Sequence, residues 1–244
     1  MNIKEIIYKI LHIKYRYLIC RFSYVYVDGS STIKIGKKTD IRFCKIHLTN
    51  NSRFETGNKV KLDHTRFSIN NGSVYVGDNS VIDNGNMPFK QNIIITHGVL
   101  NISENNRIRC SRIWIRFNGS VCTDKFVNIN DYSEIRCDEK ISIGAFTEIS
   151  YFVNIWDTNT HEFEDFKKRR DRWKAEYLNR DVSRKPQTKP ILIGSDNWIG
   201  EKSSILKGTT IGNKCIVGYS TTLSNANIPE GSKVVNQIYL KYIK

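Results

Sequence analysis

Proline, cysteine motifs and long apolar runs are scarce or missing in this chain of 244 residues. Only four prolines occur, while β-branched and aromatic residues are frequent, a balance that favours strands over helices. The six cysteines form no CxxC pair and no short spacing typical of a metal site. They indicate buried thiols in a reducing compartment rather than disulfides. We therefore expect a cytoplasmic protein.

Nucleotide-binding signatures are missing as well, because the chain has no GxxxxGK[ST] and no strand-borne GxGxxG. Acidic residues are in deficit. Lys plus Arg outnumber Asp plus Glu by 38 to 24, which gives a formal net charge of +14. Such an excess indicates anionic partners, namely phosphates, acidic polysaccharide, nucleic acid or an acidic membrane surface, and does not choose among them.

Residues 1–28 form the first predicted unit. Apolar residues recur there at helical spacing: Ile3, Ile6, Ile7, Ile10, Ile13 and Tyr17. We expect neither a secretion signal nor a membrane span, since Lys4, Lys9 and Lys14 interrupt the segment. The prediction is a basic amphipathic helix that caps the repeats described next, with peripheral contact at the inner face of the membrane as the alternative.

One nine-residue template recurs eight times between residues 33 and 217: apolar, any, apolar, turn residue, four variable residues, apolar. Its third position falls at residues 35, 56, 76, 102, 123, 143, 193 and 211. Five of the seven steps are 18 to 21 residues long. The step from 76 to 102 allows a small insertion, and the step from 143 to 193 requires one of about 30 residues.

The last third of the chain has a strict period of six. Its members are Ile193, Ile199, Ile205, Ile211, Val217 and Leu223, preceded upstream by Ile143, Ile149 and Ile155. This period fits a short strand and a turn with one inward apolar side chain per face, and three faces make a triangular coil. Alternating β-sandwich strands could mimic the looser first half but not five consecutive six-residue steps. We therefore predict an all-β fold, a parallel β-helix over residues 29–235, followed by a tail, 236–244.

Glycines that follow the inward residue are expected to supply backbone freedom at the corners of the coil. Gly144, Gly194, Gly200, Gly212 and Gly218 are in this position.

The hexapeptide pacing resembles that of the left-handed β-helix acyltransferases, which move an acyl group from coenzyme A to a hydroxyl or amine. Two stretches carry the resemblance: KPILIGSDNWIGEKSSILKGTTIGNKCIVG, residues 189–218, and VNINDYSEIRCDEKISIG, residues 127–144. The second is similar to the family stretch that presents an active-site asparagine, here Asn130, 31 residues before His161. The resemblance covers about residues 121–230, and the usual Ala-Gly-Ser is here Tyr219-Ser220-Thr221.

Acyl transfer to an alcohol needs a general base, and histidine suits this because its pKa lies near the working pH. His161 follows the inward Ile155 by six positions, where the chain leaves the repeats. The resemblance implies that His161 is the catalytic base. The other histidines are interpreted as structural or solvated: His12, His47, His64 and His97.

Two residues are predicted to assist His161. Asp157 would accept the proton on the other ring nitrogen and fix the tautomer, although Glu162 or a backbone carbonyl would serve equally well. Asn130 would donate a hydrogen bond to the oxyanion or orient the acceptor hydroxyl. The alternative for Asn130 is an ordinary turn asparagine.

Acetyl-CoA is the donor that the resemblance implies, on a surface formed by Trp198, Gly200, Gly218 and Lys233. Trp198 is predicted to be a wall for the pantetheine arm or the acceptor sugar, or a contact within a homotrimer whose active sites lie between subunits. The glycines would let the coenzyme run close to the backbone. Lys233 is a candidate for its phosphates, as are Lys207 and Lys214.

No metal is expected. A similar β-helix builds a carbonic anhydrase with three zinc histidines, whereas only one histidine lies in the relevant coils here.

The insertion, residues 156–190, carries ten Lys or Arg against seven Asp or Glu, with helix-forming residues in its middle. We predict that it binds an acidic acceptor through Lys168 and Arg169, unless it is simply a solvated helix. The predicted function is an acetyl-CoA-dependent O-acetyltransferase acting on a surface polysaccharide (capsule or O-antigen) or its precursor, and not on nucleic acid. The alternatives are N-acetylation of an amino sugar nucleotide and a non-catalytic glycan-binding or scaffold β-helix.

Overall fold

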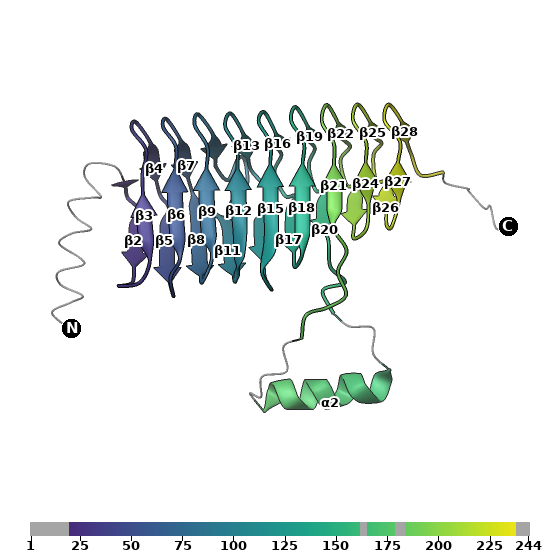
Figure 1. Cartoon of the computed structure of the whole chain (residues 1–244), viewed down its shortest axis with the longest axis horizontal. Helices are drawn as coiled ribbons and strands as arrows, with labels where there is room; N and C mark the ends of the chain where they lie inside the picture. Colours follow the sequence, from purple (N-terminus) through teal and green to yellow (C-terminus); the bar gives the residue numbers. More distant parts are fainter. Residues whose placement is uncertain (1–19, 162–164, 179–183, 238–244) are drawn as a thin grey trace.

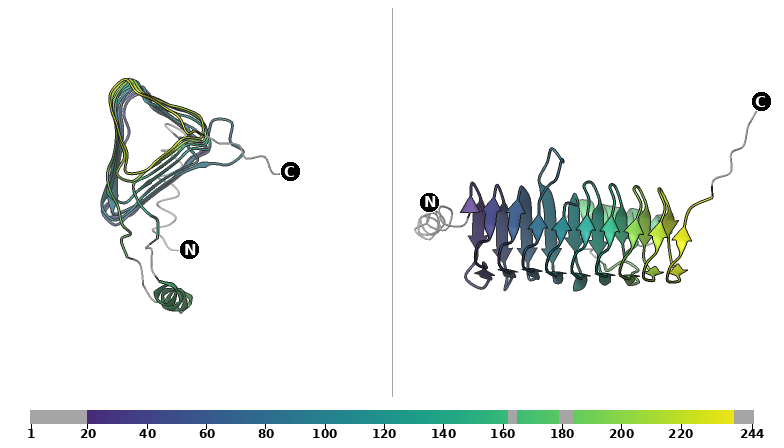
Figure 2. Two further views of the ribbon diagram at one scale, coloured as in Figure 1. Left: turned by 90° about the vertical axis from the view of Figure 1, so that its right-hand side faces the viewer. Right: turned by 90° about the horizontal axis from the view of Figure 1, so that it is seen from above.

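The computed structural model describes residues 20–161, 165–178 and 184–237. Residues 1–19 of the predicted N-terminal unit and most of the predicted tail lie outside these ranges. The last part of that unit is not helical, because Cys20–Arg21 and Tyr24–Val27 are strands of the first coil, so the solenoid begins earlier than the predicted residue 29. The described chain winds as a triangular solenoid in which every coil adds one strand to each of three parallel sheets (Figures 1 and 2). The predicted all-β class and parallel β-helix are therefore confirmed.

The three sheets, here named A, B and C in the order in which the chain enters them, contain ten, nine and nine strands. Sheet A consists of β1 (Cys20–Arg21), β4 (Asp40–Arg42), β7 (Lys61–Asp63), β10 (Val81–Ile82), β13 (Arg107–Ile108), β16 (Asn128–Ile129), β19 (Glu148–Ile149), β22 (Trp198–Ile199), β25 (Ile216–Val217) and β28 (Lys233–Val234). Sheet B consists of β2 (Tyr24–Val27), β5 (Lys45–Thr49), β8 (Thr65–Asn70), β11 (Gln91–Thr96), β14 (Arg112–Ile115), β17 (Glu134–Cys137), β20 (Asn154–Trp156), β23 (Ser204–Leu206) and β26 (Thr222–Leu223). Sheet C consists of β3 (Thr32–Lys34), β6 (Arg53–Thr56), β9 (Ser73–Val76), β12 (Gly98–Ile102), β15 (Gly119–Thr123), β18 (Lys140–Ile143), β21 (Ile191–Ile193), β24 (Thr210–Ile211) and β27 (Asn227–Ile228).

A column of buried aliphatic side chains fills the solenoid, and the six-residue period marks its members. Ile143, Ile149 and Ile155 pair in register with Ile193, Ile199 and Ile205 of the next coil, and all six are buried. The coil therefore resumes after the insertion without a shift, as the period predicts. Because the side chains of a strand alternate between faces, this inward register also fixes which residues face outward.

The strands of sheet B are longer in the first half of the solenoid, six residues in β8 and β11 against three in β23, which explains the looser period there. Phe54 and Phe67 lie wholly inside it, with ring centroids 5.0 Å apart in an edge-on arrangement. The small insertion predicted between 76 and 102 is the loop between β10 and β11. Its Asn86 backbone N–H donates to the buried carboxylate of Asp131 at 2.9 Å.

The corner glycines have a different role from the predicted one. None of the five lies in the left-handed region; that conformation occurs two residues later, for example at Phe146 (φ 55°) and Lys202 (φ 60°). A Cβ on Gly144 would lie 2.5 Å from the backbone carbonyl carbon of Gly194 in the next coil. These positions require glycine because adjacent coils approach too closely for a side chain, which is a packing constraint rather than a dihedral one.

The insertion between β20 and β21 leaves the solenoid at the corner between sheets B and C, and carries the helix α2 (Phe166–Tyr177) away from it (Figure 1). The predicted helix in the middle of the insertion is confirmed. Its two stems pair with each other at an antiparallel bridge between Thr158 and Thr188. In the described part of the chain, no helix has the length and apolar character needed to span a membrane.

We expect Phe54→Ala to lower the free energy of unfolding by about 3–5 kcal/mol, because it leaves a cavity beside Phe67. Chemical denaturation followed by circular dichroism measures this change. The control is Tyr75→Ala on β9, an exposed aromatic residue whose removal should change stability by no more than about 0.5 kcal/mol. Equal effects of the two substitutions would contradict the described core.

Candidate active site

The four residues predicted to bind the coenzyme lie together on sheet A. Trp198 pairs with Ile216, which pairs with Lys233, so the three outward side chains stand in one row over consecutive coils. Gly200 and Gly218 follow two of these strands at the corner between sheets A and B. Trp198 is 52% exposed. We call these four residues the sheet A strip.

The two glycines have no side chain, so the backbones of adjacent coils approach each other closely at this corner. A Cβ on Gly200 would lie 2.8 Å from the backbone of Gly218, and the Gly200 N–H donates to Val217 O at 2.7 Å. Beside them, Lys202 Nζ donates to the Tyr219 hydroxyl at 3.0 Å, and this hydrogen bond raises the Lys202 pKa. Sequence reasoning missed Lys202, although it follows Gly200 by two residues; its hydrogen bond to Tyr219 of the next coil is seen only in the structure.

The other two lysines proposed for the phosphates lie elsewhere. Lys207 lies at the corner between sheets B and C. Lys214 lies just before β25 of sheet A and forms an ion pair with Glu230 at 3.5 Å. Lys233 is the member of the set that belongs to the sheet A strip.

Asn130 belongs to the same side of the molecule as the strip. It follows β16 at the corner between sheets A and B, two coils before Gly200, and its N–H donates to Ile149 O at 2.9 Å. Its side chain is half-buried. Asn130 therefore does not stand beside His161 within one chain.

His161 lies in the entry stem of the insertion, beyond the corner between sheets B and C, and is exposed. Thr160, immediately before it, has a positive φ of 66° and its N–H donates to Thr158 Oγ1 at 3.1 Å. The corner that carries this stem is opposite sheet A in the triangle (Figure 2). The structure thus places the predicted base and the predicted coenzyme surface on two separate faces of a single chain.

Asp157 has a structural environment that the sequence did not reveal. Its carboxylate is fully buried and accepts backbone N–H bonds from Asp138, Glu139 and Lys140 at 2.8, 2.9 and 2.8 Å. Cys137 Sγ also donates to it at 3.2 Å. Burial raises the Asp157 pKa, and the hydrogen bonds from Asp138 and Glu139 oppose this rise.

These contacts bind Asp157 to the turn of the preceding coil. The side chain therefore fixes the start of the entry stem, four residues before His161. Its predicted role as the partner of the His161 ring remains a prediction, and the alternative acid Glu162 lies outside the described residues.

The exit stem is fixed as firmly as the entry stem. Lys189 N–H donates to Asp157 O at 3.0 Å, and Lys189 Nζ donates to Asn225 Oδ1 at 2.9 Å. The Thr188 hydroxyl donates to the Glu139 carboxylate at 2.5 Å. Both stems are thus held by neighbouring coils, which fixes the segment that leads to His161.

A ladder of arginine and tryptophan side chains covers sheet B beside the entry stem. The Arg136 guanidinium lies 4.2 Å from the Trp156 ring centroid, and that of Arg116 lies 4.3 Å from the Trp114 ring centroid. Arg136 also donates to Thr160 Oγ1 at 3.4 Å. Sequence reasoning missed this ladder, although the alternation in RIWIR at residues 112–116 is its signal.

Lys168 and Arg169 lie on α2 and are exposed. Asp165 caps the helix, accepting the N–H of Lys167 at 2.9 Å and of Lys168 at 3.1 Å. Within residues 20–161, 165–178 and 184–237, no three His, Cys, Asp or Glu side chains gather in a way that could hold a metal ion. The expectation of a metal-free enzyme stays a prediction.

No family model matches the chain. Over 118 residues it is 33% identical to the putative lipopolysaccharide biosynthesis O-acetyl transferase WbbJ of Escherichia coli K12, covering 48% of this chain and 57% of WbbJ. Over 136 residues it is 28% identical to the probable acetyltransferase Rv3034c of Mycobacterium tuberculosis, covering 56% and 39% of the two chains. Its sequence relatives are acetyltransferases.

The chain spans about half the length of these curated relatives. A solved structure, that of the polySia specific acetyltransferase NeuO, is similar with a TM-score of 0.53 and 17% identity, over 88% of this chain and 83% of NeuO. This likeness concerns the fold. The resemblance to β-helix sugar O-acetyltransferases inferred from the hexapeptide pacing is thus confirmed.

We expect Asp157→Asn to lower the free energy of unfolding by about 1.5–3 kcal/mol, because an amide nitrogen cannot accept the backbone N–H groups of residues 138–140. The pKa read from the pH dependence of acetyl transfer should not move. Asp196→Asn, at an exposed corner, is the control and should leave stability unchanged. A shifted pH profile with unchanged stability would instead place Asp157 on the His161 ring.

Proposed function

We propose that this protein is an acetyl-CoA-dependent O-acetyltransferase that acts on a sugar hydroxyl of a surface polysaccharide, capsule or O-antigen, or of its precursor. The observation that carries the proposal is the alignment of Trp198, Gly200, Gly218 and Lys233 over consecutive coils, with the side chains of Trp198 and Lys233 exposed. The similarity to WbbJ, which is named an O-acetyl transferase, favours O-acetylation over N-acetylation. Five cysteines are free thiols, in keeping with a cytoplasmic enzyme: Cys44, Cys110, Cys122, Cys137 and Cys215.

The chemistry follows from the residues. His161 accepts the proton of the acceptor hydroxyl while the hydroxyl oxygen attacks the thioester carbonyl of acetyl-CoA. The side-chain amide of Asn130 donates to the oxygen that becomes negative. As the carbon–sulfur bond breaks, the proton on His161 passes to the departing thiolate, which leaves as the thiol of coenzyme A. Trp198 bounds the pantetheine arm, and Lys233 with Lys202 faces the phosphates.

The separation of His161 from the sheet A strip supports a site formed by two chains. His161 stands beyond the corner between sheets B and C, whereas the strip and Asn130 are on sheet A and its following corner. Within one chain the base and the donor do not meet. A homotrimer in which the stem of one subunit reaches sheet A of the next would complete three sites. Such a closed ring follows from a repeated head-to-tail contact.

The acceptor is proposed to be an acidic glycan. The sequence of α2 contains six Lys or Arg and two Asp or Glu, and the whole chain has a formal net charge of +14. Lys168 and Arg169 are exposed on this helix. Cations on a stem-anchored helix would attract carboxylates of a glycan and raise its local concentration near His161.

We expect His161→Ala to lower acetyl transfer roughly 100- to 10,000-fold, which is the usual contribution of a general base. Release of coenzyme A from acetyl-CoA, measured with panels of acidic and neutral glycans, is the assay. The control is His97→Ala, because His97 is also exposed at a corner but has a partner, Asn71, at 2.9 Å and lies upstream of the insertion. Undiminished activity of His161→Ala would remove the proposed base.

A site shared between subunits predicts complementation. His161→Ala and Trp198→Glu should each be inactive alone, whereas unfolding and refolding them together should restore part of the activity. In mixed assemblies some sites pair an intact His161 from one chain with an intact strip from its neighbour. Refolding each variant alone is the control. No recovery in mixed assemblies of confirmed trimeric mass would mean that each chain contains its whole site.

A further inference from the structure

The helix α2 presents aromatic side chains that the fold does not use. Trp173 and Tyr177 stand one helical turn apart, and so lie on the same face. They are 60% and 89% exposed, which means that neither contributes a packed contact of the size typical of a core aromatic residue. Phe166, in the first turn, is also exposed at 54%.

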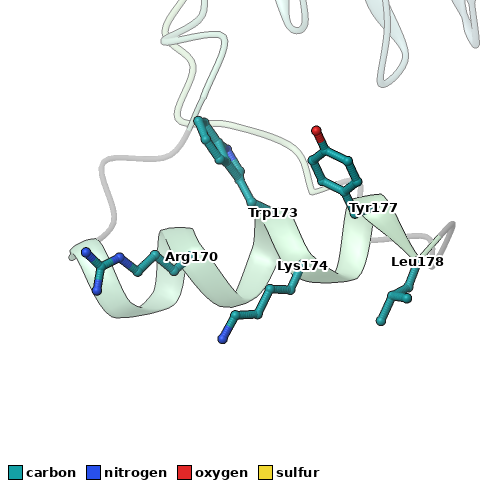
Figure 3. A pocket seen from close by; sticks show the side chains of 5 residues that line it. All are labelled: Arg170, Trp173, Lys174, Tyr177 and Leu178. Carbon is teal, nitrogen blue, oxygen red and sulfur yellow. The ribbon is translucent and has the colours of Figure 1, made fainter.

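The two rings border an open hollow of about 520 Å³ lined by Arg170, Trp173, Lys174, Tyr177 and Leu178. Trp173 and Tyr177 rise from the side of the helix that faces the stems and the solenoid, whereas Lys174 and Leu178 point the other way (Figure 3). Arg170 stands beside them. Its guanidinium lies over the Phe166 ring at 5.3 Å, and this contact restricts its position.

The composition of the hollow indicates the chemistry of its occupant. Flat aromatic rings with little side-chain entropy to lose bind the apolar face of a sugar ring, and they are the side chains that most often dominate binding energy. The neighbouring cations favour a negatively charged ligand, and α2 has a formal charge of +4, from six basic and two acidic residues. An acidic sugar combines both requirements, with one apolar ring face and an anionic substituent.

We propose that Trp173 and Tyr177 form the platform on which a ring of an acidic glycan stacks, with Arg170 pairing with its anionic group. As an acceptor subsite, this platform rests on the proposed function. It adds a specificity role to aromatic residues, where the sequence had indicated Lys168 and Arg169. His161 precedes the start of α2 by five residues, so one arm carries both the proposed base and the platform.

The test measures binding apart from catalysis. Wild type and Trp173→Ala are titrated calorimetrically with oligogalacturonate, with oligosialic acid and with neutral maltooligosaccharide. We expect wild type to bind an acidic oligosaccharide more tightly than the neutral one, and Trp173→Ala to bind it roughly tenfold more weakly. Trp173→Phe, which keeps a ring, should lose less. Tyr75→Ala, an exposed aromatic on sheet C, should bind as wild type does.

Equal binding by wild type and Trp173→Ala, or no binding of either acidic oligosaccharide by wild type, would overturn the platform. Two other ligands of the aromatic rings, a second copy of this chain and a membrane surface, can be distinguished by separate measurements. Dissociation of the oligomer on Trp173→Ala, measured by sedimentation, would assign the rings to a second copy of this chain. Loss of binding to phosphatidylglycerol vesicles without loss of glycan binding would assign them to a membrane surface. Either result would overturn the proposal.

The experiments distinguish a failure of the aromatic platform from a failure of the proposed acetyltransferase function. If acetyl transfer depends on His161 while Trp173→Ala leaves the acceptor KM unchanged, the platform is wrong and the enzyme remains. If wild type acetylates no glycan yet binds acidic oligosaccharide through Trp173, the platform stands without the enzymatic function. The KM for acetyl-CoA should be the same in wild type and Trp173→Ala, because the coenzyme surface is on sheet A.

Discussion

The inward register of the aliphatic column is the constraint on which the rest of the structure depends. Each coil must place its apolar side chains above those of the coil before it, because only then do the parallel backbone ladders and the core form together. Ile149 above Ile199 is one such pair. Once the inward positions are set, the residues adjacent to them in each strand must face outward. The row from Trp198 to Lys233 is therefore a by-product of core packing, available for a ligand without any further ordering.

The fold was largely predictable because its signal is periodic, whereas the site was predictable only in part. Six-residue spacing located the inward residues after residue 141, and the outward Trp198 followed from it. The hydrogen bonds of Asp157 could not be foreseen, since their donors are backbone N–H groups that any sequence possesses. The glycine prediction was wrong for a related reason. Glycine is required at position 144 because the backbone of the next coil lies close to it, and distances between coils cannot be read from a linear sequence.

The proposed site divides its tasks between two kinds of structure. The proposed donor surface belongs to the rigid stack, where adjacent coils leave no room for a side chain at Gly200 or Gly218. The proposed base and the proposed acceptor platform belong to an arm that departs from the stack. Rigid elements position reacting groups accurately, while segments outside the regular structure vary more readily between relatives. The basic and aromatic character of α2 is thus where selectivity for one glycan over another is expected to reside.

The paired stems have a consequence for how such a protein can change over time. Thr158 bridges Thr188, and Lys189 returns to Asp157, so the arm begins and ends at nearly the same point in space. Closing a loop costs free energy that grows only with the logarithm of its length, about 0.6 kcal/mol per doubling. An arm closed at its base can accordingly lengthen, shorten or be replaced with little penalty to the stack. Evolution could exchange the acceptor while the donor chemistry stays as it is.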